Sequence, residues 1–296
     1  MGIAELVPGV SGGTIAFITG IYIELVRSVR RIGPHLLRLL LRGRIREAWV
    51  DGNLGFLILL WTGMGTSVLT FAWLVSWLLE HRELQVWGFF FGLILASALF
   101  VGRFAAPWTV GRGIVCAIGV GIGAGLGFAS ALAFPVDPFA IFLGGAVAIC
   151  AWILPGVSGS FILLLLGQYP TVVQAIAERD LVILGALAAG CTVGLLLFAR
   201  LLVWVLRRYY EGTLALLCGF MGGALVKLWP WRVPVADDAL GVRPATPGTY
   251  ASTMEVSAAI PSVMATVILG ILVVLGLEIL SRRSRAHGIS PGEIAP

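Results

Sequence analysis

The stretch Pro8-Gly9-Val10-Ser11-Gly12 recurs as Pro155-Gly156-Val157-Ser158-Gly159, and each copy interrupts an apolar run. Proline removes a backbone donor and glycine relaxes the backbone, so each copy is expected to break a helix. The surrounding apolar runs place both breaks at membrane depth, where non-helical backbone is tolerated only inside protein or beside a water-filled cavity. A helix break repeated in two parts of an apolar chain is typical of a transporter built from two related halves.

The composition predicts a membrane protein. Of the 296 residues, 59% are hydrophobic and 12% charged, and the mean hydropathy is +1.00. A soluble domain has only about 45–50% apolar residues. The net charge of +5 comes from basic residues in short loops between apolar runs, which indicates membrane topology and not nucleic-acid binding. We expect neither a metal nor a cofactor, because the four cysteines lie in apolar segments without metal-ligand spacing: Cys116, Cys150, Cys191 and Cys218.

The hydropathy pattern predicts an all-α polytopic fold with six transmembrane helices and two re-entrant helical hairpins that carry the repeated motifs. The six apolar runs expected to span the bilayer are Leu54–Leu79, Val86–Phe104, Gly113–Phe134, Leu181–Leu206, Thr213–Trp229 and Val256–Leu280. If the hairpins leave by the side they entered, the arginine-rich loops all fall on one side. By the positive-inside rule, both termini are then cytoplasmic.

The duplication extends beyond the motifs and divides the chain into residues 1–134 and 135–296. The first half contains a basic cytoplasmic loop, 27–47, and the second an outer loop, 230–255. At an offset of 147, Ala4, Gly20, Tyr22 and Val26 match Ala151, Gly167, Tyr169 and Val173; at an offset of 127, Leu54, Gly63, Phe71, Trp77 and Gly92 match Leu181, Gly190, Phe198, Trp204 and Gly219. Three spans per half is an odd number, so the halves have inverted topology, which favours a binding site near the midplane.

The motif tips have the chemistry of an anion site. Their glycines allow close backbone approach, their hydroxyls donate hydrogen bonds, and a helix that begins after each tip points its amides there. The helix dipole contributes only ~0.3–2 kcal/mol, so a cation is also expected. We predict Arg200 in the fourth span for this role; its alternative is an arginine that extends to the interface. The other candidates are Gly9, Val10, Ser11, Gly12, Gly13, Thr14, Gly156, Val157, Ser158, Gly159 and Ser160. The alternative for both motifs is a kink that only packs.

Two longer stretches carry a family resemblance. The segment from Ala4 to Thr14 with Gly20-Ile21-Tyr22, and the segment from Pro155 to Phe161 with Gly167-Gln168-Tyr169, resemble the paired signatures of a bacterial family once called domain of unknown function 368. That family is regarded as polyprenyl-phosphate transporters. The resemblance implies a flippase of the plasma membrane that returns undecaprenyl phosphate, the lipid carrier of cell-wall precursors, from the outer to the inner leaflet. Family members usually carry a longer segment before the first motif.

Inward movement of an anionic head opposes an inside-negative potential by ~2.3 kcal/mol per charge per 100 mV. Net uptake therefore requires a lipid gradient or a co-transported cation, such as a proton or sodium ion. Glu5 and Glu24 flank the first hairpin and are candidates to carry a proton, although each could equally pair with a nearby arginine. Tyr22, Gln168 and Tyr169, in the family signatures, are further candidates for coupling or gating.

Two other function classes share features with this sequence. The motifs superficially match the Gly-x-Ser-Gly of intramembrane serine proteases, but His35, His81 and His287 all fall in loops, so no enzyme is expected. A small-anion or ion carrier or channel shares the inverted architecture and is the main alternative. In the third span, Gly119, Gly123 and Gly127 share one helix face, which favours tight helix packing over a gate.

Overall fold

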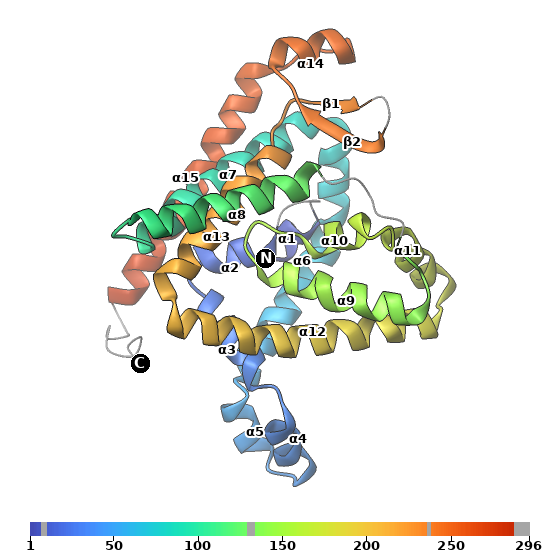
Figure 1. The fold of residues 1–296 in the computed structure, drawn as a ribbon, viewed down its shortest axis with the longest axis vertical. Helices are drawn as coiled ribbons and strands as arrows, with labels where there is room; N and C mark the ends of the chain where they lie inside the picture. The colour runs from blue at the N-terminus through green and yellow to red at the C-terminus, as the bar shows by residue number, and fades with distance from the viewer. Residues whose placement is uncertain (7–10, 129–133, 236–237, 287–296) are drawn as a thin grey trace. The chain divides into compact units, whose positions relative to one another are not determined.

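The computed structural model describes residues 1–6, 11–128, 134–235 and 238–286, and it is dominated by helices (Figure 1). Gly9 and Val10 lie outside these described residues. The helices of the first half are α1 (Gly2–Glu5), α2 (Gly12–Ile18), α3 (Tyr22–Arg31), α4 (Pro34–Leu41), α5 (Ile45–Asp51), α6 (Leu54–His81), α7 (Glu83–Phe104) and α8 (Val110–Phe128). The second half contains α9 (Pro138–Ile153), α10 (Gly159–Leu165), α11 (Tyr169–Glu178), α12 (Leu181–Arg208), α13 (Tyr210–Lys227), β1 (Arg232–Val235), β2 (Asp238–Pro244), α14 (Pro247–Met254) and α15 (Ile260–Ala286).

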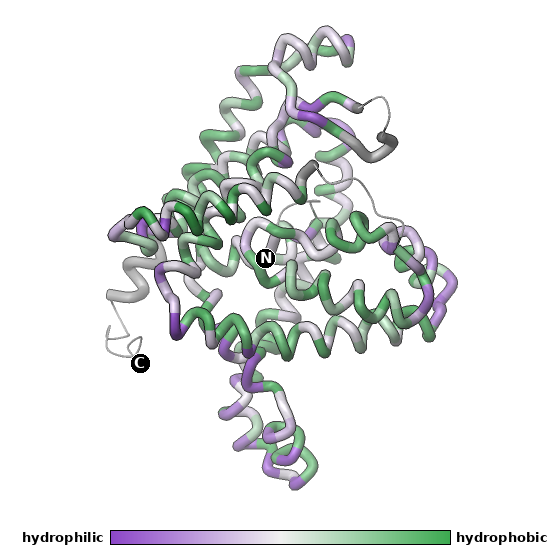
Figure 2. Tube along the Cα trace, viewed as in Figure 1, coloured by the Kyte–Doolittle hydropathy of each residue, from purple (hydrophilic) through white to green (hydrophobic). Residues whose placement is uncertain are grey.

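The structure confirms a multi-pass membrane protein in coarse terms. Among the described residues, four helices are long and apolar enough to cross a bilayer, or up to six if each bent pair counts as one span. The four are α6, α7, α12 and α15. Two of the expected spans begin at the observed residues, Leu54 and Leu181. Figure 2 shows long hydrophobic stretches along α9 and α12 and hydrophilic residues at many helix ends.

Helix bounds follow the sequence repeat. Adding 147 to the bounds of α2 and α3 gives the bounds of α10 and α11, and adding 127 to those of α6 gives α12. The paired helices bend sharply where the repeat places a glycine, by 117° between α2 and α3 and by 107° between α10 and α11. Gly20 and Gly167 take φ values of 79° and 69° at these bends, which favours glycine in both copies.

The chain forms two compact units that each combine parts of both halves. The first unit contains residues 1–16, 21–73 and 131–208, and it therefore includes both copies of the motif. The second contains residues 17–20, 74–130 and 209–296. Within the first unit α9 packs along α12, and α3 also contacts α12.

In the second unit, equivalent helices exchange partners between the halves. Helices α7 and α13 are the second long helices after the hairpins of their halves, and α8 and α15 are the third. Helix α8 of the first half packs on α13 of the second, and α15 of the second half packs on α7 of the first. Gly119 faces Gly219 and Gly123 faces Gly223, so α8 and α13 run parallel in close contact. A Cβ at Gly119 would lie 2.5 Å from the Leu216 carbonyl oxygen, whereas one at Gly121 would meet nothing within 4 Å. The glycine face expected to pack tightly does so at Gly119 and Gly123.

Helices α7 and α15 repeat this arrangement. Gly88 faces Val263 and Gly92 faces Val267, so these helices are also parallel. Gly92 and Gly219, which match at an offset of 127, each lie against the backbone of the partner helix. The match between these two glycines in sequence thus corresponds to one packing role.

The segment expected to form an outer loop, 230–255, contains regular secondary structure. Strands β1 and β2 form an antiparallel pair, and α14 follows them. Trp231 and Val233 are only 5% and 2% exposed, and Arg232 lies 3.8 Å from the centre of the Trp87 ring. The segment forms strands although it contains several prolines, because its aromatic and valine side chains are buried. The small sheet is the exception to the all-helical prediction.

Candidate functional site

The first motif reaches the second motif directly. The Ser11 hydroxyl donates to the carbonyl oxygens of Trp152 at 3.1 Å and Leu154 at 3.3 Å, in the segment that leads into the second copy. The same oxygen accepts the Gly13 amide at 3.1 Å. Ser11 is 1% exposed. The two motif copies, 147 residues apart in sequence, are therefore in contact within one compact unit.

A second contact joins the copies in the same place. The Gly156 amide donates to the Thr14 hydroxyl oxygen at 3.1 Å, and Thr14 is fully buried. Gly156 has a φ of 85°, a conformation that favours glycine. A Cβ at Gly13 would lie 2.6 Å from the Ile153 carbonyl oxygen, so the close approach requires glycine at that position as well.

The hydroxyls of the second motif have a different environment. Ser158 and Ser160 lie 3.0 Å apart, oxygen to oxygen, and either can be the donor. Ser158 and Val157 are buried, whereas Ser160 is exposed. Gly159 begins α10 and packs against α9, where a Cβ would lie 2.6 Å from the Ala148 carbonyl oxygen. The second copy thus presents a hydroxyl pair with one accessible member.

Glu5 bonds a residue of the first motif, whereas Glu24 bonds a residue outside both motifs. The Glu5 carboxylate accepts the Gly12 amide at 2.7 Å. Glu24 accepts the Asn53 side-chain amide at 2.9 Å. The structure thus gives Glu24 an amide partner, and it brings Glu5 to the first helix after the motif.

Arg200 is not brought to the motif tips by any contact among the described residues. Its guanidinium lies beside Gly33, at the junction of α3 and α4, where a Cβ would be 3.0 Å from Nη2. The residue is exposed. This position suits the interfacial alternative for Arg200, and its role toward an anion remains a prediction.

The three remaining candidates have unequal environments. Tyr22 is 1% exposed, whereas its counterpart Tyr169 is 41% exposed. Gln168 is fully buried, and its Nε2 donates to the carbonyl oxygens of Pro135 at 3.1 Å and Ala140 at 3.0 Å. Gln168 therefore fastens the start of α11 to the start of α9. This contact supports the bent hairpin.

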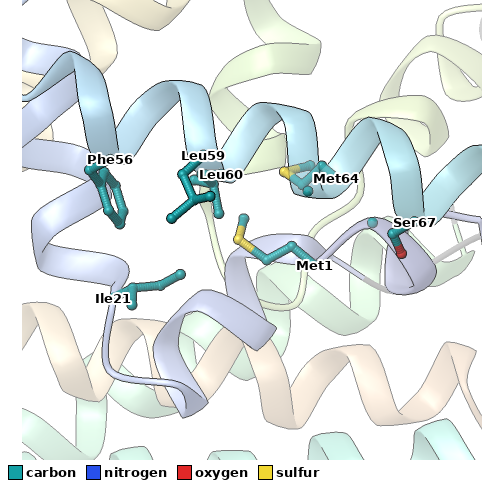
Figure 3. A pocket seen from close by; sticks show the side chains of 9 residues that line it. Met1, Ile21, Phe56, Leu59, Leu60, Met64 and Ser67 are labelled. Atoms are coloured by element: carbon teal, nitrogen blue, oxygen red, sulfur yellow. The ribbon is translucent and has the colours of Figure 1, made fainter.

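An apolar pocket of about 310 Å³ lies between α1, the start of α3 and one side of α6. Figure 3 shows the side chains of Met1, Ile21, Phe56 and Leu60 directed toward it, with Ser67 at one end. No charged side chain is among the nine residues that line the pocket: Met1, Gly2, Ile21, Phe56, Leu59, Leu60, Gly63, Met64 and Ser67. This lining suits an apolar group and not an anionic head.

Two parts of the site were not foreseen from the sequence. Trp152 and Leu154 contribute backbone acceptors, and the Gly156 amide donates to a side chain of the other copy. Backbone groups of an apolar segment give no residue-type signal. A comparison of the two copies does give a signal. Gly13 and Thr14 of the first copy correspond to Ser160 and Phe161 of the second, so the copies differ in residue type at these positions.

The chain is similar in sequence to known transporters. A family model described as undecaprenyl phosphate translocase-like matches residues 1–239. A polyprenyl-phosphate transporter of Vibrio cholerae serotype O1 is 45% identical over 232 residues, which cover 78% of this chain and 75% of that protein. A polyprenyl-phosphate transporter of Staphylococcus aureus is 30% identical over 248 residues, covering 78% and 83%. No solved structure matches the chain significantly. The family and both relatives are described as transporters, not enzymes.

Proposed function

Because the chain belongs to the undecaprenyl phosphate translocase-like family, we propose that it is a flippase that carries undecaprenyl phosphate, or a related polyprenyl phosphate, from the outer to the inner leaflet of the bacterial plasma membrane. This transport recycles the lipid carrier for cell-wall synthesis. The observation that carries the proposal is the contact between the two motif copies, which gathers hydroxyls and backbone amides from both halves at one place.

The phosphate head binds where the motifs meet. Hydroxyl and amide donors form charge-assisted hydrogen bonds to a phosphate, and the glycines bring backbone close to the ligand. Arg200, at the other end of α3, is the cation that the head meets near the cytoplasm. The tail stays in the bilayer, because α6 and α12 expose apolar side chains such as Leu69 and Leu197 along much of their length.

The direction of the packed helices supports re-entrant hairpins. Helices α8 and α13 run parallel, and the chain between them contains the α9–α11 segment and the long apolar helix α12. Because α8 and α13 are parallel, both start on one side of the membrane, and α8 ends on the other side. If α12 crosses once to bring the chain back to the start of α13, α12 must begin on the side where α8 ends. The α9–α11 segment must then leave the membrane by the side it entered. The first hairpin has the same bounds at an offset of 147 and is assigned the same form. With the arginine-rich loops inside, both termini are cytoplasmic.

Two inverted halves around one site give alternating access, in which the site faces each leaflet in turn. Net inward movement of the anionic head requires a lipid gradient or a coupled cation. We assign proton coupling to Glu5, because its carboxylate accepts the amide of Gly12, the residue that ends the first motif and begins α2. Protonation of Glu5 would weaken this contact, because a neutral carboxyl group is a poorer acceptor than a carboxylate.

The test is leaflet exchange in liposomes that contain the purified protein. The rate for undecaprenyl phosphate is compared with the rate for undecaprenol, which has the same tail and no phosphate. Faster exchange of the phosphate is expected, and equal rates would contradict recognition of the head. Flux of chloride or inorganic phosphate without lipid movement would instead favour the small-anion carrier.

A further inference from the structure

The two motif copies share the sequence Gly-Val-Ser-Gly but differ in how their hydroxyls are used. We propose that they divide the work, and this inference rests on the proposed function: Ser11 and Thr14 are positioning residues that hold the second loop, while Ser158 and Ser160 donate to the phosphate of the lipid.

The bonding of Ser11 leaves it no hydrogen for an anion. A serine hydroxyl has one hydrogen, and that of Ser11 is shared between the carbonyl oxygens of Trp152 and Leu154. Its oxygen accepts the Gly13 amide. Because Ser11 is also 1% exposed, a phosphate would have to break bonds to two carbonyls to reach it.

Thr14 also bonds the second motif copy. Its oxygen accepts the Gly156 amide, and this bond holds the second loop at a residue with a positive φ. The matching residue in the second copy is Phe161, which has no hydroxyl. The side chain of the first copy therefore bonds the backbone of the second, and Phe161 cannot form the equivalent bond to the first copy.

The second copy has a hydroxyl to spare. Ser158 and Ser160 bond each other, which uses one of their two hydrogens. The structure gives neither of them a further side-chain bond within the described residues, and Ser160 is exposed. Position 13, the counterpart of Ser160, has no room for any side chain because of the Ile153 carbonyl. The two copies therefore differ in residue type where their roles differ.

The test measures binding of undecaprenyl phosphate and of undecaprenol to the purified protein, together with its thermal unfolding and its transport rate. Ser160→Ala is expected to weaken phosphate binding about tenfold, which corresponds to about 1.4 kcal/mol, with little change in undecaprenol binding or in Tm. Thr14→Val is expected to lower the Tm and the transport rate while preserving the preference for the phosphate. Thr14→Ser, which retains the hydroxyl, recovers the rate lost in Thr14→Val.

Thr192→Val is the matched control, since it removes an exposed hydroxyl that bonds within α12 at the Ala188 carbonyl. A loss of phosphate preference in Ser11→Ala as large as in Ser160→Ala, at unchanged Tm, would overturn the division. So would an unchanged preference in Ser160→Ala. If the wild-type protein itself does not prefer the phosphate over the alcohol, the proposed function fails instead, and the two failures are thus distinguished.

Discussion

Replacing Gly13 with alanine tests whether the two motif copies touch. A Cβ at this position would lie 2.6 Å from the Ile153 carbonyl oxygen and 3.2 Å from its carbon. Both are backbone atoms, so relief requires the second loop to move. Forcing a methyl group into such a site costs about 1–3 kcal/mol. The gain in helix propensity from Gly→Ala is at most about 1 kcal/mol and offsets only part of this.

Gly65→Ala is the matched control in α6. A Cβ there meets nothing within 4 Å, so the variant gains helix propensity without a clash. We expect the two variants to differ by about 2 kcal/mol in stability, with Gly13→Ala the less stable, which is roughly 4–8 °C in Tm. Thermal unfolding in detergent micelles measures this, and transport of undecaprenyl phosphate should fall only in Gly13→Ala. If Gly13→Ala is as stable and active as Gly65→Ala, the motifs do not meet as described.

Three other outcomes follow from the packing and the site. Gly119→Ala should unfold several degrees below Gly121→Ala, because only the first glycine faces α13; equal Tm values would contradict the close contact. Gln168→Leu should lose about 2 kcal/mol of stability in thermal unfolding, because the buried amide's bonds to the Pro135 and Ala140 carbonyls are lost, and an unchanged Tm would argue against that anchor. Glu5→Gln, which retains an acceptor for the Gly12 amide, should make transport insensitive to the pH outside the liposome. Transport that still responds to pH in this variant would exclude Glu5 as the proton carrier.

Much of the helical order could be predicted from the sequence, because hydropathy reports directly on transfer into lipid. The starts of α6 and α12 were predicted at Leu54 and Leu181 and are observed there. Other bounds were less accurate. The sixth span was expected to begin at Val256, yet α15 begins at Ile260, since hydropathy does not register where helical backbone hydrogen bonding starts.

The site was predicted in its location but not in its bonding. Glycine and hydroxyl residues at Ser11 and Thr14 suit an anion and a backbone group equally well, because a hydroxyl both donates and accepts. The choice depends on which backbone lies opposite, and that is a property of the folded chain. Strand β1 escaped prediction for a related reason: burial of Trp231 and Val233 against other elements outweighs the prolines around them.

The exchange of partners in the second unit has a consequence for biosynthesis. Helices α7 and α8 are synthesised before the surfaces they pack against, which belong to α15 and α13 and begin at Ile260 and Tyr210, a hundred residues or more after the starts of α7 and α8. Until then the glycine faces at Gly92 and Gly119 are exposed to lipid or to the insertion machinery. The first half therefore cannot reach its final packing alone, and assembly waits for the last helix to be inserted.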